Sequence, residues 1–462
     1  MDFLIVLSAL LLLMLTAYRG YSVILFAPMC ALLAVFLTNP DAVLPMFSGV
    51  FMTGMVSFLK LYFPVFMLGA VFGKVIELSG FSKSIVSAVI RLLGKRHAIL
   101  SIVLVCALLT YGGVSLFVVV FAVYPFAAEM FRQSGIPKRL IPATIALGAF
   151  TFTMTALPGT PQIQNIIPTT FFKTTTWAAP WFGLIGAAFM LGGGMLYLEW
   201  RRRQAARAGE TYGEDHRNEP EPLGEMALPN PWLALLPLVL VAVLNKVFTS
   251  LIPIYFGSTA TVNMGAKALS IDVNSLVAIW AVLGALLSGI VCVLLFAFKP
   301  IASRFADGSQ SAIAGSLLAS MNTASEYGFG AVIAALPGFT LISEALRQIP
   351  NPLVNEAVSV SLLAGITGSA SGGMSIALAA MADSFIQAAN AAGIPLEVLH
   401  RVAAMASGGM DTMPHNGAVI TLLAVTGLTH KQSYKDIFAV SVAIATTAVF
   451  VGIAVYYLFG IY

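Results

Sequence analysis

Charged side chains are scarce in this chain. Asp, Glu, Lys and Arg make up 10% of its 462 residues, whereas a soluble globular protein has about 25%. Hydrophobic residues make up 59% of the sequence, and the mean hydropathy is +0.92. This composition excludes a soluble globular fold and predicts an all-α polytopic membrane protein.

Cysteine and the common catalytic motifs are lacking as well. Cys30, Cys106 and Cys292 lie in apolar stretches without CxxC spacing, which excludes a disulfide framework and a cysteine metal site. No histidine is followed by glutamate, so no HExxH zinc motif occurs, and there is no GxxxxGK[ST] phosphate-binding loop. The chain has no P-loop of its own, although it could be the membrane subunit of a multi-protein pump. We expect no metal, no cofactor, no enzymatic activity and no nucleic-acid partner.

Apolar runs of about 17–25 residues, the length that spans a bilayer, are abundant instead. No Lys or Arg precedes the first run, which favours a membrane span there over a signal peptide. Ten spans are predicted, at 3–17, 21–38, 61–79, 140–170, 178–198, 231–255, 272–298, 309–335, 401–427 and 436–460. Two paired shorter runs, at about 98–131 and 352–391, predict re-entrant hairpins. Residues 43–59 and 301–316 are expected to form the outer parts of bent helices that lead into the next span.

The two halves of the chain carry the same short motifs in the same order, 257 to 260 residues apart. The pairs are FGKVI at 72–76 with FGAVI at 329–333, GF at 80–81 with GF at 338–339, GGVS at 112–115 with GGMS at 372–375, and GIP at 135–137 with GIP at 393–395. Both hairpins are expected to turn at the GGxS motif. In a membrane chain, a duplication with Gly-interrupted apolar segments at matching positions is typical of secondary transporters, whose binding site lies at the interruptions.

Loop charges predict the orientation of the two halves. Arg201–Arg203 open the longest hydrophilic segment, and basic loops favour the cytoplasmic side. Residues 1–200 are then a first transmembrane repeat, 201–230 a cytoplasmic linker and 231–462 a second repeat. Because each half has five spans, an odd number, the second repeat is inverted relative to the first.

This orientation places the two hairpins on opposite sides of the membrane. The first opens from the cytoplasm. The second opens from outside, with Asp383, Glu397 and Arg401 at its base, and the loop 256–271 also lies outside.

The span after each hairpin is interrupted by Pro, Gly and polar residues. The breaks are Leu157–Asn165 and Gly408–Gly417, and each interior proline costs a helix about 3 kcal/mol. Aligning the prolines of the two breaks pairs Gln162 with His415, with a slip of a few residues left open. The N–H groups that begin a half-helix carry about half a positive charge and can bind a carboxylate.

Two hairpin tips and two broken helices that meet near the midplane would form one composite site. Gly-Gly pairs let the backbone approach a ligand, and hydroxyl and amide groups can donate to an anion. Runs of small residues also occur where helices merely pack closely. The candidate substrate-binding residues are Gly112, Gly113, Ser115, Gln162, Asn165, Ser369, Ser371, Gly373, Ser375, Thr412 and Asn416.

Three ionisable residues are candidates for proton coupling: Asp411, His415 and Glu326. An imidazole changes charge near neutral pH, and a desolvated carboxylate can hold a proton. Each has a structural alternative, since a lone histidine is more often a core residue and Asp411 could cap the following half-helix. The counterpart of Glu326 in the first repeat is Gly69, which cannot titrate.

These motifs resemble those of the gluconate permease family, within the ion transporter superfamily of inverted-repeat carboxylate carriers. The resemblance covers essentially the whole chain. It is carried by FGKVI at 72–76, GGVSLFV at 112–118, the Pro-rich break at 158–161, GSASGG at 368–373 and PHNG at 414–417. It implies proton-coupled uptake of sugar acids or related hydroxy acids across the bacterial inner membrane. It also implies a homodimer with scaffold and transport domains and an elevator-type movement.

One motif departs from the gluconate carriers, which have His-Pro-Gly-Pro in the first broken helix where this chain has Gly159–Gln162. The branch therefore resembles more closely the D-β-hydroxybutyrate permease-like members, and fewer donors in the first break suit a smaller acid.

The sequence thus predicts a proton symporter of a small organic anion, a short hydroxy-monocarboxylate or a sugar acid. Sodium coupling stays open, because unwound carbonyls with Ser and Asn oxygens also suit Na⁺. A channel is a further alternative. A membrane-embedded serine hydrolase is another, since Ser371 and His415 could approach each other, although a catalytic dyad has no need of a symmetric twin.

Overall fold

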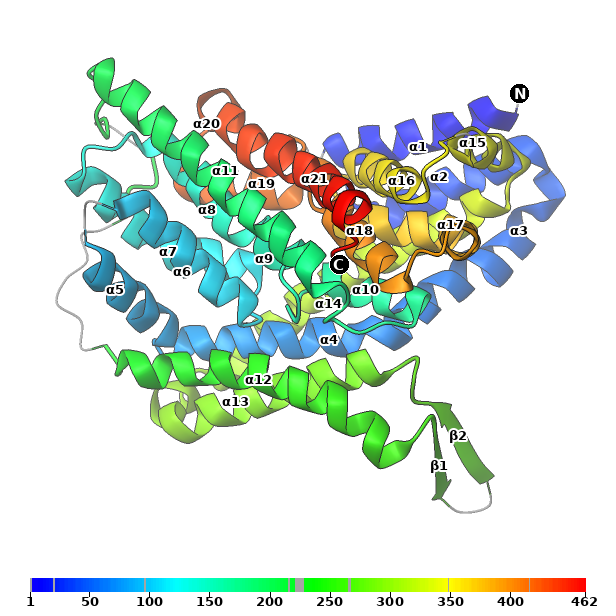
Figure 1. Cartoon of the computed structure of the whole chain (residues 1–462), viewed down its shortest axis with the longest axis horizontal. Helices are drawn as coiled ribbons and strands as arrows, with labels where there is room; N and C mark the ends of the chain where they lie inside the picture. Colours follow the sequence, from blue (N-terminus) through cyan, green and yellow to red (C-terminus); the bar gives the residue numbers. More distant parts are fainter. Residues whose placement is uncertain are drawn as a thin grey trace.

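Helices account for nearly all the secondary structure of the computed structural model (Figure 1), which describes residues 2–19, 21–94, 97–214, 217–220, 228–264, 267–347, 349–414 and 416–462. The first half contains α1 (Asp2–Tyr18), α2 (Val23–Thr38), η1 (Pro40–Ala42), α3 (Val43–Pro45), η2 (Met46–Phe51), α4 (Met52–Leu78), α5 (Phe81–Leu93), α6 (Ala98–Tyr111), α7 (Leu116–Gln133), η4 (Lys138–Leu140), α8 (Ile141–Ala149), α9 (Phe152–Thr155), α10 (Ile163–Phe172) and α11 (Pro180–Arg207). The second half contains α12 (Pro231–Phe256), β1 (Thr259–Met264), β2 (Lys267–Asp272), α13 (Val277–Ala302), α14 (Phe305–Ala335), α15 (Pro337–Arg347), α16 (Pro352–Thr367), α17 (Ala370–Ala391), α18 (Leu396–Ser407), η5 (Met410–Thr412), α19 (Gly417–Thr426), α20 (His430–Ile437), η6 (Phe438–Ala443) and α21 (Ile444–Phe459).

The contacts between helices are the same when each helix is replaced by its counterpart in the other half. Helix α1 packs on α15 as α12 packs on α5, and α2 packs on α14 as α13 packs on α4. Likewise α7 packs on α19 as α17 packs on α10, while α4 packs on its own counterpart α14. This is the pattern of two related halves, so the predicted inverted repeat, with a hairpin and a broken helix in each half, is confirmed.

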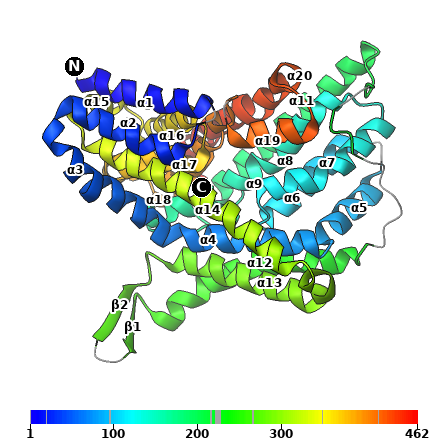
Figure 2. The same cartoon turned by 180° about the vertical axis from the view of Figure 1, so that it is seen from behind.

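Two long helices run through the centre and support the hairpins (Figures 1 and 2). Residues 40–78 form one helical run of 39 residues, and α14 has 31 residues. Residues 43–59 and 305–316 therefore continue into the following helices, as expected. The predicted range 301–316 is wrong at its start, because 301–302 still belong to α13 and 303–304 form the turn before α14. Phe72 and Phe329, the first residues of the matched FG motifs, are both fully buried on these helices.

The described part of the chain contains five helices that are long and apolar enough to cross a membrane: Pro40–Leu78, Pro180–Arg207, Pro231–Phe256, Val277–Ala302 and His430–Phe459. Shorter apolar helices accompany them, at Asp2–Thr16, Val23–Thr38, Ala98–Tyr111, Pro352–Thr367 and Gly417–Thr426. Large hydrophobic side chains such as Leu251 and Leu295 are exposed on the outer helices α12 and α13. Exposed apolar surface on spanning helices suits contact with lipid.

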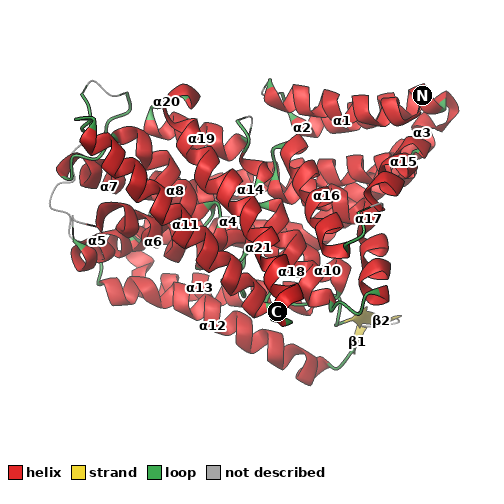
Figure 3. Ribbon diagram, turned by 45° about the horizontal axis from the view of Figure 1, so that its top comes forward, coloured by secondary structure: helices red, strands yellow, loops and turns green. Residues whose placement is uncertain are grey.

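A β-hairpin is the one departure from helix among the described residues, and it projects from the helices between α12 and α13 (Figures 1 and 3). Its strands are antiparallel, with Thr259 opposite Asp272 and Met264 opposite Lys267. The sequence analysis expected only a connection outside the membrane there. The β-branched Thr259, Thr261 and Val262 favour a strand once the chain leaves the apolar span.

Ion pairs hold the segment after α11 against the helix ends. Arg139 pairs with Glu210 at 2.7 Å and with the buried Asp436 at 3.0 Å, and Arg201 pairs with Asp436 at 2.6 Å. Lys138, also buried, pairs with Glu219 at 2.9 Å. The first half and α20 of the second half are therefore joined at this end by charge-assisted hydrogen bonds.

One of these pairs gives stability a pH dependence. The hydrogen bond from Arg139 lowers the pKa of Glu210 below its ordinary value of 4.5. A carboxyl whose pKa is lower in the folded state stabilises the fold above that ordinary value, and the contribution is lost as pH falls through the folded pKa. Thermal unfolding midpoints of wild type and Glu210→Gln, measured from pH 7 to pH 3, should differ at neutral pH and converge below about pH 4.5.

The matched control is Glu214→Gln, in the same segment and without an ion pair among the described residues. It should leave the wild-type pH profile unchanged. A Glu210→Gln profile parallel to that of wild type down to pH 3 would contradict the assignment.

Candidate functional site

The first hairpin turns at its Gly-Gly-x-Ser motif, as predicted. Helix α6 ends at Tyr111, and Ser115 is the N-cap residue of α7. Gly113 has φ +95°, a left-handed conformation that favours glycine. A Cβ on Gly112 would overlap the side chain of Leu238 in α12, so this glycine allows close packing of the tip. The Ser115 side chain makes no capping hydrogen bond and is partly exposed.

The second hairpin turns four residues before its Gly-Gly-x-Ser motif, which corrects the predicted equivalence of the two motifs. Gly368, with φ +64°, ends α16, and Ser369 begins α17 as its N-cap, accepting a hydrogen bond from the Gly372 N–H at 3.0 Å. A left-handed glycine and a capping serine are what end one helix and start the next. Ser369 is therefore the counterpart of Ser115, whereas Ser375 lies in the second turn of α17, fully buried.

The glycines inside α17 are explained by packing. A Cβ on Gly373 would overlap the backbone of Ala364 in the other arm of the hairpin. A Cβ on Gly372 would overlap Oε2 of Glu326 in α14. Gly373, predicted as a substrate contact, thus lies between the two arms of the hairpin, and Gly372 makes room for a carboxylate.

Both predicted helix breaks are present, and they end alike. Helices α10 and α19 each have ten residues and begin after N-cap residues Gln162 and Asn416. The counterpart of Gln162 is therefore Asn416 and not His415, a slip of one residue. The Asn416 side chain accepts a hydrogen bond from the Val419 N–H at 2.8 Å, whereas Gln162 makes no side-chain cap.

Each N-cap amide also donates to the hairpin tip of its own half. Gln162 Nε2 donates to the Thr110 carbonyl at 2.7 Å and to the Val114 carbonyl at 3.5 Å. Asn416 Nδ2 donates to the Gly368 carbonyl at 2.8 Å. The start of each half-helix is thereby fastened to a hairpin tip, and α10 also packs on α17 of the other half.

Asn165 lies in a buried network that the sequence analysis missed. Its Nδ2 donates to the carbonyls of Thr160 and Thr176, both at 2.9 Å. Its Oδ1 accepts from Arg401 Nη1 at 2.9 Å and lies 3.1 Å from His400 Nε2. Asn165 is thus fully engaged by protein groups, which indicates a supporting role in the first break.

The position of Arg401 corrects its expected place at the outer base of the second hairpin. Its side chain is fully buried in α18 and donates to the carbonyls of Thr155, Thr176 and Ala178 at 2.7 to 3.3 Å. Helix α18 begins at Leu396, before the predicted span, so Arg401 is carried inside the fold. The neighbouring His400 lies 2.6 Å from Thr174 Oγ1 through Nδ1. Only the adjacency of two polar residues in an apolar helix could have signalled this network.

The second break holds its polar groups mainly against the protein. Thr412 donates to Ser441 at 2.8 Å, and its carbonyl accepts from the Tyr434 hydroxyl at 3.1 Å. Asp411 Oδ1 is buried without a hydrogen-bond partner in the described structure. His415 lies outside the described residues.

Several polar side chains also lie close together where α14 meets the start of α17. The Ser371 hydroxyl lies 3.2 Å from Thr323 Oγ1. Glu326 is 3% exposed, and its Oε2 has no hydrogen-bond partner in the described structure. The buried hydroxyls of Ser325 and Ser375 are also without described partners. These groups have hydrogen-bonding capacity that the described protein atoms do not use.

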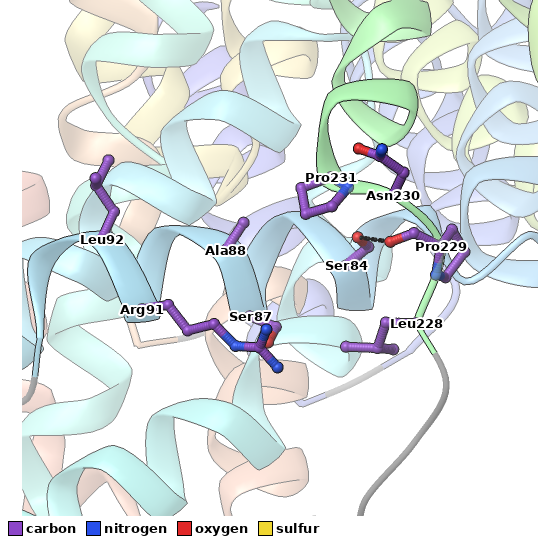
Figure 4. A pocket seen from close by; sticks show the side chains of 9 residues that line it. All are labelled: Ser84, Ser87, Ala88, Arg91, Leu92, Leu228, Pro229, Asn230 and Pro231. Carbon is purple, nitrogen blue, oxygen red and sulfur yellow. Dashed lines mark hydrogen bonds between the residues drawn. The ribbon is translucent and has the colours of Figure 1, made fainter.

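Two cavities that the described residues form lie away from the candidate residues. A cavity of about 840 Å³ lies between α5 and the start of α12 (Figure 4), where Ser84 donates to the Pro229 carbonyl at 2.6 Å, and none of the candidate residues lines it. A second cavity of about 420 Å³ between α12 and α13 has apolar walls. Among the described residues, no three His, Cys, Asp or Glu side chains are grouped to hold a metal ion.

The chain is similar along its whole length to a protein of Bacillus subtilis (strain 168) described as the uncharacterized transporter YxjC. The identity is 57% over 472 aligned residues, covering 100% of both chains. No family model matches the sequence. Among solved structures, the YdaH transporter of Alcanivorax borkumensis is similar over 88% of each chain, with 17% identity and a TM-score of 0.49. At that score the similarity bears neither on the fold nor on the function of this chain.

Proposed function

The chain belongs to the transporter family of Bacillus subtilis YxjC, and we propose that it is a proton-coupled secondary transporter of a small organic anion. The anion is a short hydroxy-monocarboxylate or a sugar acid, and the membrane is the bacterial inner membrane. Residues 1–200 and 231–462 act as the two inverted repeats, joined by a cytoplasmic linker at 201–230.

The observation that carries this proposal is the paired construction of the tips and breaks. In each half, the N-cap amide of a ten-residue half-helix donates to its hairpin tip. Four helix N-termini, those of α7, α10, α17 and α19, therefore begin at these junctions, and helix N-termini favour bound anions. A hydrolase has no need of two such junctions related by the repeat.

The substrate contacts come from groups whose hydrogen-bonding capacity is free. Ser115 at the first tip has a partly exposed hydroxyl that makes no capping hydrogen bond in the described structure, and Ser375 has a buried hydroxyl without a described partner. Asn165 and Thr412 serve as supports, since protein groups already hold them.

Movement is proposed to be of the elevator type within a homodimer. The outer helices α1, α2, α12 and α13 form the scaffold, and α14, which packs on α17 of the second hairpin, moves with the hairpins. The hairpins and broken helices form the part that carries substrate. Asp411, His415 and Glu326 remain the candidates for proton coupling.

Transport by purified protein in liposomes tests the proposal. With an outside-acid pH gradient in sodium-free buffer, a panel of labelled hydroxy acids and sugar acids should include one that accumulates above its external concentration. A protonophore should abolish the accumulation. Transport that ignores the pH gradient and depends on sodium would reject proton coupling, and equilibration without accumulation would indicate a channel.

A further inference from the structure

We propose that the side chain of Glu326 occupies the position at the N-terminus of α17 where the carboxylate of the substrate binds; this position is called the seat. The arriving substrate displaces Glu326 from the seat, and Glu326 then takes up the transported proton. This inference rests on the proposed function, because it assigns the coupling step of anion–proton symport to one residue.

The contacts of Glu326 place its carboxylate in the first turn of α17. The side chain comes from α14, and a Cβ on Gly372 would overlap its Oε2. The hydroxyl of the N-cap residue Ser369 hydrogen-bonds to the carboxylate, and the same hydroxyl accepts from the Gly372 N–H at 3.0 Å. An internal carboxylate thus lies where the N–H groups of a helix start attract an anion.

Polar atoms at the seat also have hydrogen-bonding capacity that the described protein atoms do not use. Glu326 is 3% exposed, yet its Oε2 has no hydrogen-bond partner in the described structure. The Ser375 hydroxyl, buried one turn further along α17, is likewise without a described partner. A buried polar oxygen without a partner costs free energy. Oε2 is therefore a position where a proton would be stabilised once the negative charge of a second carboxylate arrives.

The position that corresponds to Glu326 in the first half carries no carboxylate. Gly69, the counterpart of Glu326 on α4, has no side chain, and no atom lies within 4 Å of where its Cβ would be. Gly73, one turn later on α4, faces the backbone of Ser115 at the first tip. The first half therefore has the same supporting helix without a built-in anion, and this pair of helices takes up one proton for each substrate.

The exchange balances in charge. When Glu326 is ionised in the free protein, its carboxylate accepts the hydrogen bond of the Ser369 hydroxyl at the start of α17. Two carboxylates at one seat cannot both remain ionised, so Glu326 takes a proton from water as the substrate carboxylate takes its place. An O–H bond of a hydronium ion breaks as an O–H bond forms on Oε2, and the substrate anion and the proton cross together without net charge. On release, the proton returns to water and Glu326 returns to its seat.

No charged group competes for this role among the described contacts of Glu326. Helix α14 packs against α2, α4, η2, α13, α15 and α17. The titratable side chains that the described parts of these elements carry are Cys30 on α2, Lys60, Tyr62, Lys74 and Glu77 on α4, Cys292 and Lys299 on α13, Glu344 on α15 and Asp383 on α17. None of them forms a described hydrogen bond or ion pair with Glu326, and Lys74 pairs with Glu77 at 3.1 Å.

Glu326→Gln tests the inference, because glutamine keeps the shape of the side chain and cannot take up a proton. In liposomes, accumulation driven by a pH gradient should fall at least tenfold, while exchange of labelled for unlabelled substrate across the membrane should persist. Substrate affinity of the wild type should weaken about tenfold per pH unit at alkaline pH, as expected when one proton binds with the substrate. The affinity of Glu326→Gln should be independent of pH.

Glu356→Gln is the matched control. Glu356 is another fully buried carboxylate, on α16, with neither oxygen partnered in the described structure, and this variant should remain proton-driven. If Glu326→Gln does not purify as a stable protein, Glu326→Asp should keep the pH dependence and bind substrate more tightly at alkaline pH, since the shorter side chain withdraws from the seat.

The outcomes separate this inference from the proposed function. Accumulation by Glu326→Gln at the wild-type level, or loss of coupling in Glu356→Gln instead, would overturn the role of Glu326 and leave proton symport standing. Loss of both uptake and exchange in a well-folded Glu326→Gln would also overturn displacement. A wild-type protein that transports no acid, or only with sodium, would overturn the proposed function itself.

Discussion

Arg401→Ala should lower the stability of the protein by about 4 kcal/mol or more, and the variant should fail to accumulate or unfold several degrees earlier. The fully buried guanidinium donates to three carbonyl groups and to Asn165 Oδ1. Truncation would leave the Thr155 and Ala178 carbonyls without a described donor, at about 1–3 kcal/mol for each buried group. It would also leave a cavity that the close-packed interior cannot fully close.

Two further variants separate charge from geometry at this position. Arg401→Lys keeps the charge but loses the planar fork of donors, so its unfolding midpoint should lie between those of wild type and Arg401→Ala. Arg304→Ala removes an exposed arginine at the start of α14, and its effect should stay within about 0.5 kcal/mol. Thermal unfolding in detergent measures all three. A midpoint of Arg401→Ala equal to that of wild type would contradict the buried network.

Gly373→Ala should destabilise the second hairpin and abolish transport. The added methyl group would overlap the backbone of Ala364, and backbone cannot rotate aside as a side chain can, so the two arms must separate. Overpacking of this kind costs about 1–3 kcal/mol, and the separation would also displace the Gly368 carbonyl that accepts from Asn416. Unfolding midpoints and uptake in liposomes are the measurements.

Gly417→Ala is the matched control, because no atom lies within 4 Å of its Cβ position. It is the first residue of α19, where alanine is a better helix former by about 1 kcal/mol, so stability should be unchanged or improved. The comparison also separates packing from ligand contact at Gly373. A Gly373→Ala protein as stable as wild type but with weaker substrate binding would support ligand approach instead.

The Gly and Pro residues of the sequence predicted the architecture well, because their effects on the backbone are local. The hairpins at 98–131 and 352–391 and both broken helices follow from residues that a continuous helix disfavours. The register of the repeat was less well predicted. The matched Gly-Gly-x-Ser letters suggested Ser375 as the twin of Ser115, but the N-cap position belongs to Ser369, since capping depends on where the preceding helix ends.

The site's supporting contacts could not be predicted, because they join residues far apart in sequence. Arg401 and Asn165 are separated by 236 positions, and no local pattern reports such a contact. The same holds for Glu326, whose proximity to Gly372 gives a reason for a glycine that the sequence alone assigned to ligand approach. The residue types were informative, but their partners come from the tertiary fold.

The length of the central helix has a consequence for how the protein sits in its membrane. The run Pro40–Leu78 has 39 residues, and at 1.5 Å per residue it is ~58 Å long. The hydrocarbon layer is only about 30 Å thick, so this rod must lie obliquely, extend into the headgroups, or both. Bilayer thickness would then set its inclination, and lipids with longer or shorter acyl chains would alter the path of the elevator-type movement that we propose.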